Sequence, residues 1–240
     1  MNNTRRFIAL LLAILLLLAA FPAASLAESY KIQTLNLNQW YKLQGNPTEI
    51  YKLKVTGDTI VSFSCKGIKA DTWAGIGIYR DKSCNDSIDS CGIDEAASGS
   101  GAFVLYSGTY YIYMYDEKEV GKVKFSTRKT AAVNKDNYCL GKAISLKAGK
   151  KAEIAQTKKN NYHRWYRIKL AKTQSITFSG MSQYNFTLYD RNLNRLSCSD
   201  QGDVCVTQGR QPKGTYYLEI DRADLSDLMQ RGRYTAFSWK

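Results

Sequence analysis

Residues 108–112 read GTYYI and residues 214–220 read GTYYLEI, and this repeated stretch decides the fold. In each copy a glycine, which suits a tight turn, precedes apolar or aromatic side chains on mainly alternate positions. Residues 50–55 (IYKLKV) and 165–170 (WYRIKL) alternate in the same way. An alternating strand has one face on a core and the other in water. The pattern therefore predicts antiparallel β-sandwich structure and not a parallel α/β sheet.

The repeat extends well beyond this stretch. Residues 51–54 (YKLK) correspond to residues 166–169 (YRIK), in the same order along the chain as the two GTYY copies. The offsets change by a few residues, as expected for two copies of one domain whose loops differ in length. We therefore expect an all-β chain with a first β-sandwich at 30–128, a linker at 129–138 and a second β-sandwich at 139–240.

The N-terminal residues resemble an export signal. Arg5 and Arg6 precede an apolar run at residues 7–21, which is short for a bilayer span of roughly 20 residues. Ser25 and Ala27 supply the small side chains that precede a signal-peptidase cut. We expect a cleaved signal peptide at 1–27 and a secreted, extracytoplasmic protein without a membrane span.

The positive charge is concentrated in the second half of the chain. The formal net charge is +13, yet residues 28–128 hold 12 basic and 12 acidic side chains, against 20 and 9 in residues 129–240. Ten basic residues and one acidic residue fall within 142–172. Such a patch attracts phosphate or sulfate polymers, although a solvated face that aids only solubility fits equally. We expect turns on both sides of a short strand at 152–155 to gather ligand-binding residues at one end of the second sandwich. These residues are Lys147, Lys150, Lys151, Lys158, Lys159, Arg164 and Trp165.

Six cysteines in an exported chain predict disulfide bonds. Cys84 and Cys91 are seven residues apart, as are Cys198 and Cys205, so we expect one local bond in each sandwich. Cys65 and Cys139 remain and would tie the first sandwich to the start of the second. We expect no metal site at these cysteines, because neither close pair has a companion His or Cys nearby.

No catalytic device is evident in the sequence, and a free-standing hydrolase is the third hypothesis. His163 is the only histidine and there is no G-x-S-x-G motif. Two acidic groups offer oxygen ligands for calcium, although solvated turn residues explain them as well. The first group is Asp81, Asp86 and Asp89, and the second is Asp190, Asp200 and Asp203. We expect no other cofactor.

Three segments of the second copy resemble the bacterial pre-peptidase C-terminal domain: residues 186–200 (FTLYDRNLNRLSCSD), 214–220 and 232–235 (GRYT). The first copy matches less well, because GKV at 121–123 replaces the family's closing Gly-x-Tyr. The resemblance implies a jelly-roll-like β-sandwich of the kind appended to secreted proteases, with roles in substrate or surface binding and sometimes in calcium binding. We expect no attached catalytic domain, which departs from the family pattern.

Together these patterns predict a secreted, non-catalytic protein that binds a carbohydrate or an anionic cell-surface polymer through the basic face of the second sandwich. The alternative is a protein-interaction or adhesin subunit that works with a separately encoded secreted enzyme. We expect no intracellular nucleic-acid partner, because the chain carries an export signal.

Overall fold

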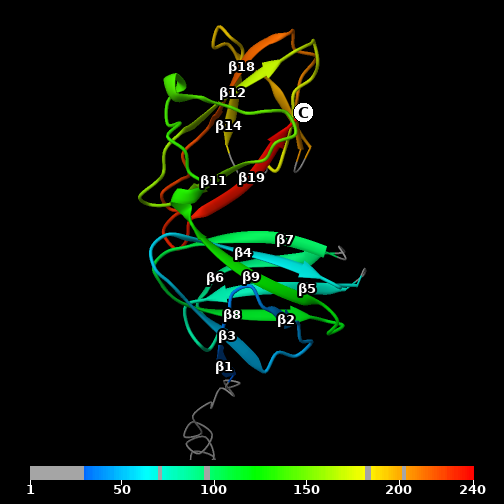
Figure 1. The fold of residues 1–240 in the computed structure, drawn as a ribbon, viewed down its shortest axis with the longest axis vertical. Coiled ribbons are helices and arrows are strands. Elements are labelled where there is room, and N and C mark those ends of the chain that lie inside the picture. Colours follow the sequence, from blue (N-terminus) through cyan, green and yellow to red (C-terminus); the bar gives the residue numbers. More distant parts are fainter. Residues whose placement is uncertain (1–29, 70–71, 95–97, 182–184, 202–203) are drawn as a thin grey trace, which may run out of the picture.

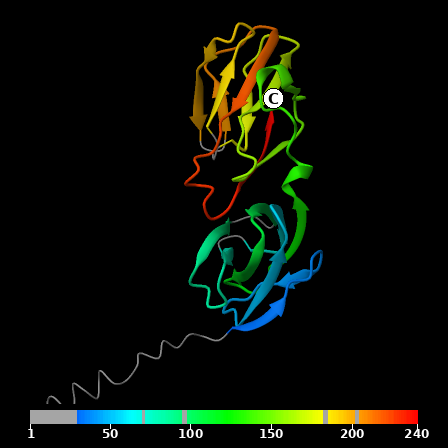
Figure 2. The ribbon, with the colours of Figure 1, turned by 90° about the vertical axis from the view of Figure 1, so that its left-hand side faces the viewer.

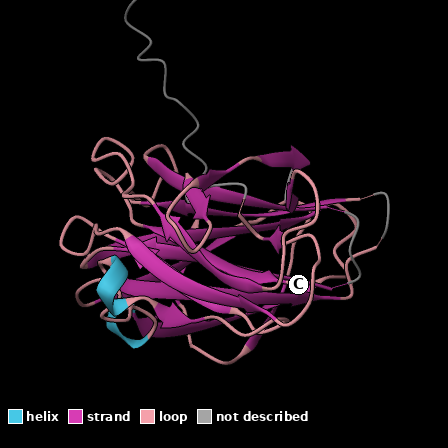
Figure 3. Cartoon of the chain, turned by 90° about the horizontal axis from the view of Figure 1, so that it is seen from above, coloured by secondary structure: helices cyan, strands magenta, loops and turns pink. Residues whose placement is uncertain are grey.

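The computed structural model describes residues 30–69, 72–94, 98–181, 185–201 and 204–240, and nearly all of its regular structure is β-strand (Figures 1 and 3). The predicted all-β sandwich fold is confirmed. The expected signal peptide at residues 1–27 lies outside the described residues. Within the described ranges, no helix has the length and hydropathy that a membrane crossing requires.

The first sandwich packs a five-stranded sheet, in the order β1-β3-β8-β5-β6, against a four-stranded sheet, in the order β2-β9-β4-β7. Its strands are β1 (Lys31–Thr34), β2 (Trp40–Lys42), β3 (Glu49–Val55), β4 (Thr59–Lys66), β5 (Trp73–Tyr79), β6 (Ser87–Asp94), β7 (Ser98–Leu105), β8 (Gly108–Asp116) and β9 (Lys122–Lys129). β1 runs parallel to β3, and the other neighbours are antiparallel.

The second sandwich is built in the same way, from a sheet in the order β10-β12-β18-β14-β15 and a sheet in the order β11-β19-β13-β17-β16. Its strands are β10 (Ile144–Ser145), β11 (Ala152–Gln156), β12 (Arg164–Leu170), β13 (Thr177–Ser179), β14 (Phe186–Tyr189), β15 (Arg195–Leu196), β16 (Cys198–Gln201), β17 (Val204–Thr207), β18 (Gly214–Ile220) and β19 (Arg233–Trp239). Here too the first strand runs parallel to the third, β10 to β12, so the two sandwiches share a topology.

Each sandwich has its own core, filled mainly by the inward-facing side chains at alternate positions of its strands. Leu43, Ile76 and Phe125 lie in the first core, and Phe178 and Phe237 lie in the second. All five side chains are at most 1% exposed. Fully burying a side chain of this size contributes roughly 1.5–3 kcal/mol to the stability of the folded state. This gain explains why apolar residues occupy alternate positions in the sequence of each strand.

The two sandwiches are stacked along the long axis of the molecule and meet through the loop between β18 and β19 (Figures 1 and 2). The hydroxyl of Tyr106 donates to the carbonyl of Leu228 at 2.7 Å, and the amide of Gly232 donates to the carbonyl of Val104 at 2.9 Å. A small apolar cluster beside them includes Val104 and Ala155. Residues 225–230, for which the sequence suggests a short helix or turn, form turns.

The segment expected as a linker follows the surface of the second sandwich closely. It contains the short 3-10 helix η1 (Thr130–Ala132), and a second one, η2 (Leu140–Lys142), follows it. The side chain of Asn134 both donates to and accepts from the backbone of Ala155. The side-chain amide of Asn137 donates to the carbonyl of Trp165, and the backbone carbonyl of Asn137 accepts from the Trp165 N–H. These bonds make the segment part of the second sandwich.

Candidate functional site

The outer face of the β10-β12-β18-β14-β15 sheet collects aromatic and charged side chains. Along β12, the inward residues are buried, whereas Trp165, Arg167 and Lys169 point outward. Tyr217 and Glu219 do the same on β18, and Thr187 and Tyr189 on β14. The register places Trp165 opposite Glu219, and Arg167 opposite Tyr217, so neighbouring strands bring these side chains together.

Two aromatic rings form a fixed pair on this face. The rings of Trp165 and Tyr189 are stacked, with centroids 5.6 Å apart and an interplanar angle of 19°. The hydroxyl of Tyr189 donates to Oε2 of Glu219 at 2.9 Å. Partial burial and this hydrogen bond together raise the pKa of Tyr189 above its usual value. At neutral pH the Tyr189 hydroxyl is therefore protonated, and its hydrogen bond to Glu219 holds the stacked rings in place.

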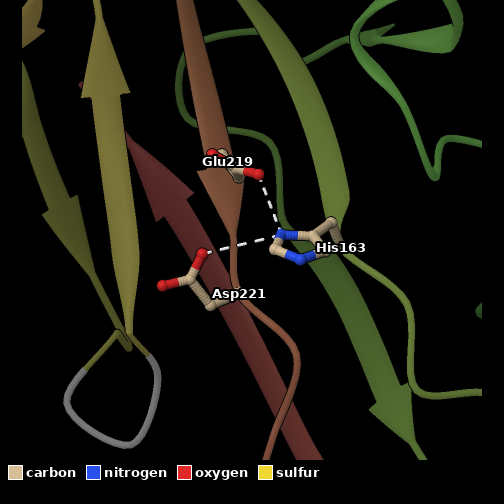
Figure 4. Close-up of side chains that lie close together, drawn as sticks. All are labelled: His163, Glu219 and Asp221. Atoms are coloured by element: carbon tan, nitrogen blue, oxygen red, sulfur yellow. Dashed lines mark ion pairs between the residues drawn. The ribbon is translucent and has the colours of Figure 1, made fainter.

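His163, Glu219 and Asp221 converge at one end of the same face (Figure 4). Nδ1 of His163 lies 2.8 Å from Oε1 of Glu219 and 3.7 Å from Oδ1 of Asp221. One ligand atom from each residue can be chosen so that all lie within 4.8 Å of one another, a grouping that could hold a metal ion. In the sequence, His163 stands out only as the single histidine of the chain.

A pocket of about 690 Å³ opens beside this cluster. His163, Asp221 and the lysines 158 and 159 line it together with residues of the β18–β19 loop. It lies on the second sandwich, next to the loop that contacts the first. A ligand on the aromatic face can therefore extend to the histidine and reach two ammonium groups.

The predicted basic residues fall into two separate groups. Lys147, Lys150 and Lys151 precede β11, whereas Lys158 and Lys159 follow it. Five strand residues, at about 3.3 Å each, separate the groups. The expectation that they share one end of the sandwich is wrong, because a strand carries the chain from one end to the other.

Arg164 does not belong to a surface patch. It is 3% exposed, and its guanidinium donates to the carbonyl of Lys135 and to Oδ1 of Asn160, both at 2.8 Å. Burial lowers its pKa from the usual arginine range. The predicted role as a surface ligand is corrected to a structural one, which anchors the connecting segment. Trp165, the next residue, points outward as a ligand-binding residue must.

The residues that sequence reasoning missed are Tyr189, Tyr217, Glu219 and Asp221. They belong to strands or strand ends that the sequence did show as alternating, so their outward direction could have been derived from the period of two. The convergence of Glu219 and Asp221 on His163 could not be derived in this way, because it depends on the register between β12 and β18.

Two of the aspartates considered for calcium close turns. Asp81 accepts backbone N–H groups from Ser83, Asn85 and Asp86, and the last of these bonds contributes most to lowering the pKa of its carboxyl. The side-chain amide and the backbone N–H of Asn194 both donate to the carboxylate of Asp190, which lowers its pKa as well. Both carboxylates are therefore satisfied by donors within their own turns. Asp203 lies outside the described residues.

The cysteines do not form the expected disulfide bonds. The thiols of Cys65, Cys84, Cys139, Cys198 and Cys205 are free, so none of the three predicted bonds is present in the described structure. Cys84 lies in the loop between β5 and β6, where Asp81 and burial raise its pKa to about 11, burial being the larger cause. Cys65 is buried on β4 in the first core, whereas Cys139 is exposed at the start of η2.

No protein-family model matches the chain, and no curated protein matches it in sequence. Among solved structures it is similar to the PBSX exported protein XepA, with 10% sequence identity, a TM-score of 0.25, and 85% of this chain and 86% of that chain covered. It is also similar to the T=1 Penaeus vannamei nodavirus, with 9% identity, a TM-score of 0.22, and coverages of 76% and 81%. Neither likeness is strong enough to bear on function.

Proposed function

We propose that the protein is a secreted, non-catalytic binding protein that holds a carbohydrate or an anionic surface polymer on the outer face of the β10-β12-β18-β14-β15 sheet. The observation that carries this proposal is the stacked pair of Trp165 and Tyr189, with Arg167 and Lys169 exposed beside it. The binding surface is thus the aromatic face of the second sandwich and not the turns around β11.

Aromatic side chains on a flat sheet suit the apolar faces of sugar rings, because each ring offers a large rigid contact area and few rotatable bonds. Both rings are half-buried. The stack and the hydrogen bond from Tyr189 to Glu219 hold them in position before any ligand arrives. Such preorganisation reduces the entropy lost on binding.

Charged side chains next to the rings favour an acidic polymer. The Arg167 guanidinium donates to Oγ of Ser145 through Nε and Nη2, at 3.3 and 3.0 Å, and the side chain remains exposed. Arginine binds sulfate, phosphate or carboxylate groups with two parallel hydrogen bonds. The resemblance to an accessory domain of secreted proteases and the apolar N-terminal run support an extracellular binding role.

The test is retention of the full chain on a panel of neutral and anionic glycans and wall polymers at low and high salt. We expect Trp165→Ala to weaken binding roughly tenfold or more, as for a central aromatic anchor. We expect Arg167→Gln/Lys169→Gln to weaken binding to anionic polymers mainly at low salt, since those contacts are electrostatic.

The internal repeat supplies a matched control. Lys52→Gln/Lys54→Gln removes the same two charges from exposed positions of β3, the strand of the first sandwich that corresponds to β12. This variant should bind like the wild type apart from a small effect of net charge. Equal losses in the two double variants, or unchanged binding of Trp165→Ala, would show that the aromatic face is not the binding surface.

A further inference from the structure

The ends of β12 and β18 bring one imidazole and two carboxylates to the same face of the sheet. Arg164 pairs with Ile220 in the antiparallel register, so His163 and Asp221, each one residue beyond, lie opposite one another. Glu219 is two residues before Asp221 and points to the same side as its neighbour Trp165. The three groups therefore meet because of strand register and not because of a flexible loop.

Nδ1 of His163 does not point directly at its nearest carboxylate oxygen. Nδ1 of His163 is buried and has no hydrogen-bond partner, although Oε1 of Glu219 is only 2.8 Å away. The oxygen therefore lies off the line along which an N–H group would donate. Metal ligands have this relation, because each points at the ion and not at its neighbour. Two ligands about 2.1 Å from a tetrahedral ion lie about 3.4 Å apart. The 3.7 Å between Nδ1 and Oδ1 of Asp221 is near this separation, whereas Oε1 of Glu219, at 2.8 Å, would have to move outward by about 0.6 Å when the ion binds.

Glu219 is oriented by a neighbouring side chain. Its Oε2 accepts the hydroxyl proton of Tyr189 at 2.9 Å, which leaves Oε1 directed toward His163. Hydrogen bonds of this kind hold metal-binding carboxylates in position. Tyr189 is thus a positioning residue for the cluster.

We propose that His163, Glu219 and Asp221 form a binding site for a divalent transition-metal ion of the zinc class. One imidazole nitrogen and two carboxylate oxygens suit zinc in a four-coordinate site, with the fourth position open to the pocket lined by Lys158 and Lys159. Calcium is disfavoured because it takes six to eight oxygen ligands. The inference is independent of polymer binding.

The experiment is calorimetric titration of the chelator-treated full chain with zinc chloride, followed by the absorption spectrum with cobalt(II) as a substitute ion. We expect one equivalent of metal to bind. Binding should weaken at least about tenfold in His163→Ala and in Glu219→Gln, and several-fold in Tyr189→Phe, whose effect would be indirect. The control Glu117→Gln, which removes an exposed carboxylate from the first sandwich, should bind like the wild type.

Three results would overturn the proposal. The first is no binding of zinc to the wild type at micromolar concentration. The second is unchanged binding in His163→Ala, with folding checked by circular dichroism. The third is a thiolate-to-cobalt charge-transfer band, which would place the ion at the free thiols of Cys198 and Cys205 instead.

Discussion

Arg128 connects the two sandwiches through charged hydrogen bonds. It lies at the end of β9 and donates to both carboxylate oxygens of Glu153 on β11, and also to the hydroxyl of Tyr234 at 3.0 Å. The bond from Arg128 is the largest cause of the lowered pKa of Glu153. Because both side chains are about one-third exposed, solvent screening limits the pair to about 1 kcal/mol.

This pair predicts an acid-sensitive contribution to stability. A carboxyl whose pKa is lowered by folding stabilises the protein above its ordinary pKa, and the contribution is lost as the pH falls through the lowered value. Glu153→Gln should therefore cost about 1 kcal/mol at pH 7 and less at pH 3. Urea unfolding of both proteins at the two pH values measures this.

The control for the acid prediction is Glu117→Gln, which removes an exposed carboxylate from the first sandwich. Its stability difference from the wild type should be small at both pH values. A cost of Glu153→Gln that is the same at pH 3 and pH 7 would contradict an ionic origin.

For single residues, the sequence predicts whether a side chain points into the core or outward better than it predicts the groups to which that side chain is hydrogen-bonded. The alternation in β12 places Arg164 on the same side as Tyr166 and Ile168, and the structure finds all three buried. The charge of Arg164 suggests a place on the surface, but its place in the alternation of β12 predicts that it is buried. Its partners, the carbonyl of Lys135 and the side chain of Asn160, depend on the path of the connecting segment and have no signature in the sequence.

Among the connecting elements, the β18–β19 loop can approach β7 closely only because residue 232 is a glycine. A Cβ atom on Gly232 would lie 2.4 Å from Cγ1 of Val104 and 2.6 Å from the carbonyl oxygen of Gln156. Gly232→Ala should therefore destabilise the protein by about 1–3 kcal/mol, because the loop and β7 must move apart. Gly141→Ala is the control, since nothing lies within 4 Å of its Cβ position, and it should be close to neutral. Equal unfolding midpoints in urea for the two variants would contradict the close approach.

Strand placement also changes the expected disulfide pairing. Cys91 on β6 and Cys65 on β4 pack against the same core, and burial followed by the nearby Cys91 thiol raises the pKa of Cys65 to about 12. Cys84 instead lies beside Tyr79 and Tyr113 on the outer face of the sheet.

Refolding with oxidised glutathione tests this pairing. Each bond forms when two thiols pass two electrons and two protons to the oxidant, which becomes two molecules of reduced glutathione. Peptide mapping without reduction should then find Cys65 joined to Cys91, and Cys198 joined to Cys205. A Cys84–Cys91 peptide would restore the pairing inferred from spacing.

The strands of this protein can be predicted from its sequence, whereas the pairing of its cysteines cannot. The strand pattern and the GTYY repeat were sufficient for the fold class, because alternation directly reflects burial. Equal spacing of cysteines was not sufficient for pairing. Cys84 lies in a loop and Cys91 in β6, whereas Cys198 begins β16 and Cys205 lies in the adjacent β17. The same seven residues therefore cover different elements in the two sandwiches.

For the whole molecule, the contacts between the sandwiches predict cooperative unfolding. Each sandwich has a separate core, so coupling depends on the interface, where the bonds of Tyr106 and Arg128 lie beside the Gly232–Val104 bond and a small apolar cluster. Calorimetry of the wild type should show one transition. Tyr106→Phe/Arg128→Ala should broaden this transition or separate it into two, because the coupling between the two cores is weakened.

The control for coupling makes the same two kinds of change inside the second sandwich. Tyr216→Phe/Arg210→Ala removes hydrogen bonds to the carbonyls of Pro212 and Thr173. It should lower the melting temperature and keep a single transition. Two transitions in the wild type would contradict coupling.

The hydrogen bonds that hold the connecting segment on the second sandwich determine where the protein can be cut into fragments. Asn134 and Asn137 hold it against β11 and β12, so it lacks the freedom that a protease needs to draw a backbone into its cleft. Limited digestion should therefore spare residues 130–143, and fragments should be designed to keep them with the second sandwich. A fragment that begins after residue 143 would lose the partners of Ala155 and Trp165 and leave the carbonyl-bound guanidinium of Arg164 without its anchor.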